Sequence, residues 1–119
     1  MKFVQVLETL PSLRKLAGQD LSIKNLYKVS KLMGSLENEI AFYDIQRNKI
    51  LSRYCDIVDN QYVPREADIE KLNAEMGELM NTEVECEIKE VVIGLDEDVK
   101  LSYNDLVSLR GLVRIEEVE

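Results

Sequence analysis

The chain has 119 residues, of which 45% are apolar and 32% are charged, and its formal net charge is −8. This length fits one domain with a real hydrophobic core, and the ordinary apolar content argues against wholesale disorder. Histidine is absent, which removes the commonest general base and every Ser-His or Cys-His nucleophile pair. No segment approaches the ~20 apolar residues of a membrane span, and the start MKFVQVLETL lacks a signal-type apolar region, so we expect a cytoplasmic protein.

Charge is distributed unevenly along the chain. Residues 1–64 carry nine Lys or Arg and seven Asp or Glu, whereas residues 65–119 carry six and sixteen. Direct binding to the phosphates of DNA or RNA is therefore disfavoured for the second half. The acidic half either keeps the protein dissolved, which we favour, or faces a basic partner.

The first predicted element is a short amphipathic helix over residues 4–17. Leucines recur at steps of three through this segment, and Gly18 is a plausible stop. Pro11 fits best in the first turn of a helix, so the helix is expected to be either kinked or restarted there.

A long ladder of apolar residues predicts the main element of the fold, a helix from about Ser22 to Val58. The spacings alternate between three and four, which places the residues on one face of an α-helix but not of a strand. Such a helix would be roughly 55 Å long at about 1.5 Å per residue. The ladder consists of Leu26, Val29, Met33, Leu36, Ile40, Tyr43, Ile50, Tyr54 and Ile57, with the polar Arg47 as one rung.

A second amphipathic helix is expected over about residues 65–81, opened by Pro64 after the connection 59–64. A connection this short implies an antiparallel helical hairpin. We expect Ile50, Tyr54 and Ile57 to pack against Ile69, Leu72 and Met76. Together with the first helix, this partner nearly covers the ladder, so a monomeric core is sufficient, and a homodimeric coiled coil remains the alternative.

After Asn81 the apolar period changes from that of a helix to that of a strand. Residues 83–88 alternate between acidic and apolar side chains, which predicts a half-buried strand with an acidic outer face. Ser102 and Asp105 predict the start of a last short helix, and residues 114–119 a charged tail with a short strand through Ile115. The expected fold is α+β and predominantly helical, in a single domain 1–119 with a helical core over about 4–81 and an acidic strand-helix appendage over about 82–119.

Two groups of residues are candidates for partner binding. Phe42 and Ile45 lie on the far side of the long helix from the ladder, where either the C-terminal strand unit covers them, which we favour, or they form an exposed patch. The other group is the row Glu83, Glu85 and Glu87, whose spacing approximates that of nucleic-acid phosphates. The favoured interpretation of this row is a solvated strand face that discourages edge pairing.

Signals for bound groups are weak. Lys24, Lys28 and Lys31 form a basic stripe that is ordinary for a solvated helix face, and Asp96-Glu97-Asp98 lacks the spacing of a calcium loop. Cys55 and Cys86 lie outside any metal-ligand spacing and are expected to be free thiols. No cofactor, metal site, catalytic residue or membrane association is expected.

In their order, the segments LSIKNLYKVSKLMGSLENEIAFYDIQRNKILSRY, ADIEKLNAEMGELM, EVECEIKEVVI and LSYNDLVSLRGLV resemble a family of small uncharacterised proteins encoded by bacteriophages and prophages of Gram-positive bacteria. The resemblance implies a phage-type accessory protein in the host cytoplasm, with no established activity and no functional residue to transfer. We therefore expect a non-enzymatic protein that binds another protein, in an accessory or assembly role. The alternative is an acidic inhibitor of a host nucleic-acid-handling or defence enzyme.

Overall fold

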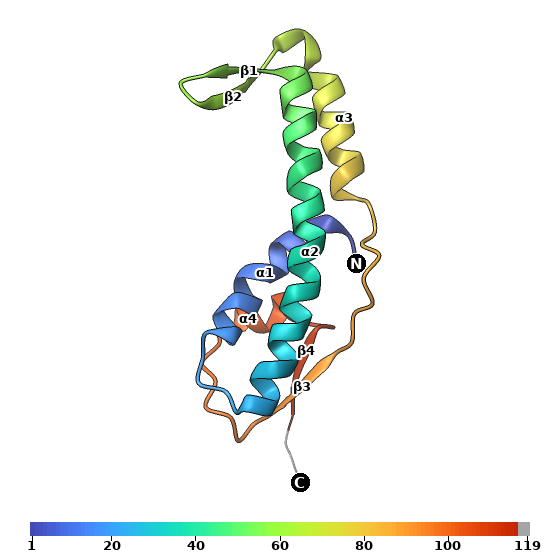
Figure 1. Ribbon diagram of the computed structural model, residues 1–119. Helices are drawn as coiled ribbons and strands as arrows, with labels where there is room; N and C mark the ends of the chain where they lie inside the picture. Colours follow the sequence, from blue (N-terminus) through green and yellow to red (C-terminus); the bar gives the residue numbers. More distant parts are fainter. Residues whose placement is uncertain (117–119) are drawn as a thin grey trace.

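The computed structural model describes residues 1–116 and has an elongated shape with extents of 60, 29 and 22 Å (Figure 1). The fold is α+β and predominantly helical, as expected. Its helices are α1 (Phe3–Ala17), α2 (Ile23–Tyr54), the 3-10 turn η1 (Glu66–Asp68), α3 (Ile69–Met80) and α4 (Tyr103–Ser108). Its strands are β1 (Cys55–Val58), β2 (Gln61–Pro64), β3 (Val91–Gly94) and β4 (Val113–Glu116).

The long helix α2 is the axis of the molecule, and the ladder is the face that the other elements cover. Val29, Leu36 and Tyr43 are buried on this face. The predicted end at Val58 is wrong, because the helix stops at Tyr54 and the chain continues directly into β1. Ile57 extends the ladder spacing by coincidence and lies in a strand, where its side chain is exposed.

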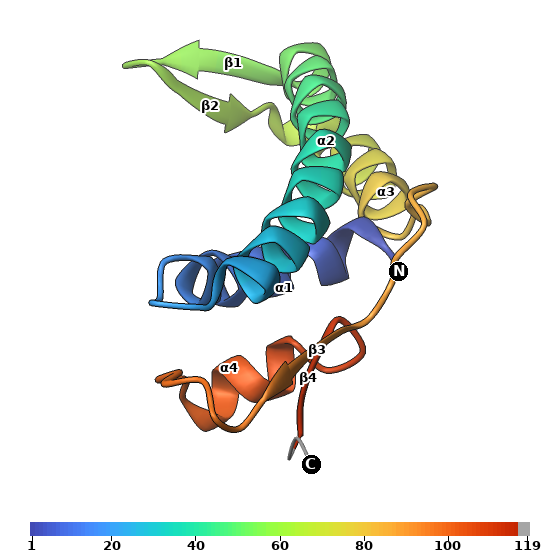
Figure 2. The ribbon, with the colours of Figure 1, turned by 60° about the horizontal axis from the view of Figure 1, so that its bottom comes forward.

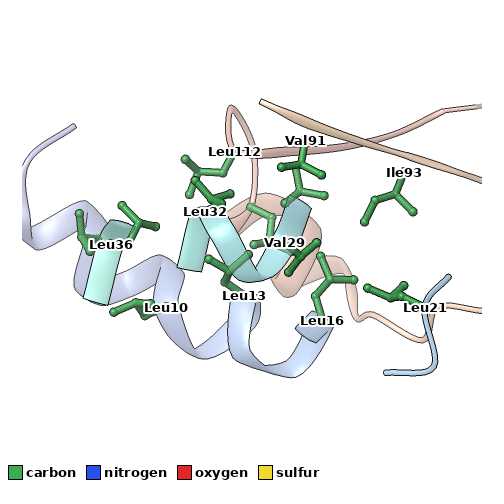
Figure 3. Packing of buried hydrophobic residues seen from close by; sticks show 13 residues of the cluster. Leu10, Leu13, Leu16, Leu21, Val29, Leu32, Leu36, Val91, Ile93 and Leu112 are labelled. Atoms are coloured by element: carbon green, nitrogen blue, oxygen red, sulfur yellow. The ribbon is translucent and has the colours of Figure 1, made fainter. Parts of the chain in front are cut away.

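Helix α1 packs across the first half of α2 and supplies much of the main core. The helix runs unbroken through Pro11, so the expected restart at this residue is wrong. It ends at Gly18, whose backbone is right-handed (φ −82°), so the stop needs no left-handed glycine. Leu13 and Leu16 are fully buried between α1 and α2 near Val29, and Leu36 lies near Leu10 at the other end of the cluster (Figure 3).

Helix α3 returns along the second half of α2, which confirms the antiparallel helical hairpin (Figure 1). Leu72 and Leu79 are buried on the side of α3 that faces α2. The predicted contact of Ile57 with Ile69 is wrong, because both side chains are exposed and Ile57 belongs to β1. Pro64 ends β2 and does not open the helix.

The C-terminal unit is a strand-helix-strand crossover that joins the main core. Strands β3 and β4 pair in parallel, in a register that sets Val91 beside Val113 and Ile93 beside Ile115. The crossover through α4 supplies the long connection that parallel strands need. Ile93, Leu109 and Leu112 are buried in the same cluster as α1 and α2. The predicted short strand through Ile115 is confirmed, and the rest of the predicted tail, residues 117–119, lies outside the described residues.

Asp105 joins α4 to α1. The expected capping box is confirmed, because Asp105 N–H donates to Ser102 Oγ at 3.1 Å and Ser102 N–H donates to Asp105 Oδ2 at 3.0 Å. Lys15 Nζ lies 2.6 Å from the same carboxylate oxygen, and Ser12 Oγ donates to Oδ1 at 3.0 Å. The Lys15 ammonium, followed by the Ser102 amide and the Ser12 hydroxyl, lowers the pKa of Asp105 far below its usual range.

Both cysteines are free thiols, as expected. Cys55 is buried at the junction of α2 and β1, and Cys86 is half-buried. Burial, followed by the nearby Glu39 carboxylate, raises the pKa of the Cys86 thiol, so it stays protonated and unreactive near neutral pH.

Candidate functional site

Between α2 and α3 the chain forms a two-stranded antiparallel hairpin, β1–β2. The register sets Asp56 opposite Val63 and Val58 opposite Gln61. Asp59 and Asn60 connect the strands with left-handed backbones, at φ values of 51° and 63°. A two-residue type I′ turn requires this conformation at both positions, and Asp and Asn tolerate it better than most residues. The sequence therefore specifies a tight hairpin and not a loose connection.

Arg65 holds the base of this hairpin to the helices. Its Nε donates to Asp68 Oδ2 at 2.8 Å, its Nη1 donates to Asp56 Oδ1 at 3.3 Å, and its Nη2 donates to the carbonyl of Arg53. The hydrogen bond to Asp68 is the main reason why the pKa of Arg65 is raised. The guanidinium thus connects the end of α2, the first strand and the end of the 3-10 turn, where α3 begins.

Apart from Cys55, which is buried at its base, the hairpin is exposed on both faces. Ile57 is 68% exposed, and Val58, Tyr62 and Val63 are also exposed. The Tyr62 hydroxyl reaches back to α2, where it lies 3.4 Å from Ser52 Oγ. Figure 2 shows the hairpin standing off the end of α2, apart from the body that α1 and the C-terminal unit form. An isolated two-stranded hairpin is marginally stable in water, so this one depends on its base or on a partner.

Phe42 and Ile45 are exposed on the outer face of α2. Their exposed fractions are 51% and 55%, so the expectation that the C-terminal strand unit covers them is wrong. That unit packs against the first half of α2 instead, where β3 meets Leu32. Phe42 leans on Phe3 of α1, with ring centroids 6.1 Å apart, and Ile45 lies one helical turn closer to the hairpin.

The segment with Glu83, Glu85 and Glu87 is extended, but it is not a strand. Within residues 1–116, only an isolated bridge between Lys2 and Glu83 pairs it with another segment, so the predicted strand over 83–88 is wrong. The predicted alternation is nevertheless present, because the three carboxylates are exposed and the apolar residues between them are half-buried against the core. Glu83 lies 2.7 Å from the amino group of Met1, which lowers the pKa of this carboxyl.

The sequence gives only a weak signal for a bound cation at the acidic turn 96–98. In the structure this turn has a structural role. Glu97 accepts hydrogen bonds from Asn25 Nδ2 at 2.6 Å and from the Ser22 N–H at 3.2 Å. These donors lower the pKa of Glu97, and its charge lies at the positive end of the α2 dipole. Glu97 therefore caps the long helix from a distant part of the sequence, while the Ser22 side chain makes no cap hydrogen bond.

The residues that sequence reasoning missed are the exposed apolar side chains of the hairpin, Val58, Tyr62 and Val63. A signal for them was present: the pair Asp59-Asn60 stands between two short segments rich in β-branched and aromatic residues. The hairpin and the second half of α2, which carries Ile45, form one end of the molecule, and the segment with the glutamates runs between α3 and β3 (Figure 1).

Within residues 1–116, no group of three or more Asp, Glu or Cys side chains is placed to share one metal ion. None of the helices in this range combines the length and the apolar character that a membrane crossing requires. Comparisons of the chain with protein-family models, with curated proteins and with solved structures found no match.

Proposed function

We propose that this chain is a non-enzymatic accessory protein of phage type, which acts by binding another protein through the β1–β2 hairpin. One observation carries the proposal: Ile57, Val58 and Val63 are exposed on a short sheet that projects from the helical body. Ile57 shares one face of this sheet with Tyr62, and Val58 shares the other face with Val63, so both faces present apolar side chains. Exposed apolar surface of this kind is typical of an interaction site. The helical body would then hold the hairpin in a fixed position, which suits an assembly role.

The hairpin suits binding because much of its conformation is set in advance. Arg65 fixes its base, and the turn residues Asp59 and Asn60 fix its tip. A preformed segment loses less conformational entropy when it binds, so more of the contact free energy appears as affinity. Tyr62 supports the proposal, since tyrosine is enriched among the residues that dominate binding energy.

Charges around the hairpin point to an apolar partner surface. Asp56 is paired with Arg65, and Arg53 is paired with Glu75 at 2.8 Å. The hairpin therefore carries little net charge beyond Asp59, in a protein whose overall charge is −8. Binding through such a surface should depend weakly on salt, and Ile45 and Phe42 could extend it along α2.

A second candidate is the acidic inhibitor of a host nucleic-acid-handling or defence enzyme. It is favoured by Glu85 and Glu87, which are exposed and make no ion pair within residues 1–116. Glu83 supports it less, because the amino group of Met1 already neutralises this carboxylate. Two free carboxylates on one short segment offer a small surface to a basic groove.

The test is site-specific photo-crosslinking from three single positions in the host that produces the protein. A photoreactive phenylalanine analogue replaces Ile57 in the hairpin, Glu85 in the acidic segment, or Asn73 on the outer face of α3 as a control. The proposal expects one defined adduct from position 57 and none from position 73. Adducts from position 85 alone would support the acidic inhibitor instead, and equal adducts from all three would contradict both. An adduct with a second copy of the chain would replace the proposed partner with self-association.

A further inference from the structure

A groove opens on the opposite half of the molecule from the hairpin, between the first half of α2 and the chain that leads into β3. Its volume is about 480 Å³, which lies in the range of about 300–1,000 Å³ that small-molecule sites occupy. One wall belongs to α2 and the other to the segment 87–92. The lining consists of Lys28, Lys31, Leu32, Ser35, Glu87, Lys89, Glu90, Val91 and Val92.

Three lysines from two separate segments line this groove. Lys28 and Lys31 lie one turn apart on α2, and Lys89 comes from the opposite wall. Within residues 1–116, none of the three lies within 4.0 Å of a carboxylate. Of the two acidic residues in the lining, Glu90 already has a cation, since Arg114 lies 3.4 Å away. Unpaired positive charge is thus concentrated here, in a protein that is acidic overall.

The floor of the groove is apolar. Leu32 and Val91 are buried members of the main core, and Val92 is half-buried beside them. The Ser35 hydroxyl donates to the carbonyl of Lys31 in its own helix, so it is already satisfied. An anionic group that met the lysines would therefore have an apolar surface directly beneath it.

We propose that this groove binds a small amphipathic anion, with its acidic group held by Lys28, Lys31 and Lys89 and its apolar part lying on Leu32 and Val91. Charge-assisted hydrogen bonds from lysine would fix the acidic group, and burial of the apolar part would add affinity. An extended polyanion such as nucleic acid fits less well, because Glu87 lies at the groove and the rest of the C-terminal half is acidic.

The first experiment measures binding of the fluorescent anion 8-anilinonaphthalene-1-sulfonate to the full chain and its displacement by ten-carbon compounds below their micelle concentrations. Decanoate and decyl phosphate carry an acidic group, decanol is neutral, and decyltrimethylammonium is cationic. The two anions should displace the dye at concentrations at least tenfold lower than decanol and the cation. The difference between decanoate and decyl phosphate tells whether the site prefers a carboxylate or a phosphate. Equal displacement by all four compounds would overturn the proposal.

The second experiment locates the site with charge-matched variants. Replacing Lys28, Lys31 and Lys89 with Gln should weaken binding of decanoate or decyl phosphate at least tenfold. The control replaces three other exposed lysines with Gln and should leave the affinity unchanged; these are Lys24, Lys49 and Lys71. Equal loss in both variants would show a nonspecific charge effect and refute the site. Because all six side chains are exposed, circular dichroism should show both variants folded.

Discussion

Two matched substitutions to alanine test which side of the long helix faces the core. Leu36 lies on the buried face of α2, and Ile45 lies on its outer face. Leu36 packs in the cluster that α1, α2 and the C-terminal unit form (Figure 3). It is 0% exposed, whereas Ile45 is 55% exposed. Truncating a buried leucine to alanine removes its transfer free energy and leaves a cavity, and the cost is about 3 kcal/mol. For a domain of this size that corresponds to a drop in melting temperature of roughly 12 °C.

Ile45→Ala is the control, because it removes a side chain of similar size from the same helix. Its effect on the free energy of unfolding should stay within about 0.5 kcal/mol, since exposed substitutions rarely exceed this and alanine is the better helix former. The assay is urea unfolding followed by far-UV circular dichroism, with both variants beside the parent protein. Equal destabilisation by the two substitutions would mean that the outer face of α2 is also packed, and the assignment of the core would be wrong.

Two further predictions concern Asp105 and the hairpin turn. The pKa of Asp105 is lowered in the folded protein, so the unfolded chain binds its proton first as the pH falls. Its contribution to stability is therefore complete above about pH 5 and is lost progressively below about pH 4, until the pH has fallen through the lowered pKa. Asp105→Asn should destabilise the fold most at pH 7 and by a steadily smaller amount as the pH is lowered from about 4 to about 2, and an equal effect at pH 7 and pH 2 would contradict this reasoning. At the turn, Asn60→Gly should leave hydrogen exchange of the β1 and β2 amides unchanged or slower, whereas Asn60→Val should accelerate it, because a β-branched residue is strained at a positive φ. Similar exchange in both turn variants would argue against the tight turn.

The helical part of the fold could be predicted from the sequence because its signals are local. The three-four ladder specifies one face of α2, and the pair Ser102 and Asp105 specifies the start of α4. The end of α2 could not be placed by periodicity, since Ile57 fits the helical spacing and the strand equally well. In such a short segment, the turn-forming pair Asp59-Asn60 is the stronger signal.

Contacts between distant segments could not be predicted in the same way. The parallel pairing of β3 with β4 and the capping of α2 by Glu97 leave no mark on the local sequence, because neither partner is near the other in the chain. The alternation over residues 83–88 predicts a strand, but alternation requires only that one side of the segment is buried. A strand also needs a neighbouring backbone, and among the described residues only Lys2 offers one, at Glu83.

The candidate surfaces were predicted in part. Phe42 and Ile45 stand out in the sequence because they are apolar and opposite the ladder, and they are exposed in the structure. The sequence pattern does not predict the groove between α2 and β3. Of the lysines that line this groove, it places only Lys28 and Lys31 together, in the basic stripe of the long helix. The third lysine of its lining, Lys89, joins them through the tertiary fold.

The central claim, that the hairpin binds a protein partner, is tested most directly by comparing two triple variants for binding to the partner identified by crosslinking. One variant replaces Ile57, Val58 and Val63 with Thr, which keeps the β-branched shape and removes apolar surface. The other replaces Glu83, Glu85 and Glu87 with Gln. Affinity measured at low and high salt should fall at least tenfold in the Thr variant and stay close to the parent in the Gln variant, with little dependence on salt. Loss of binding in the Gln variant alone, together with a steep salt dependence, would contradict the claim and favour the acidic inhibitor.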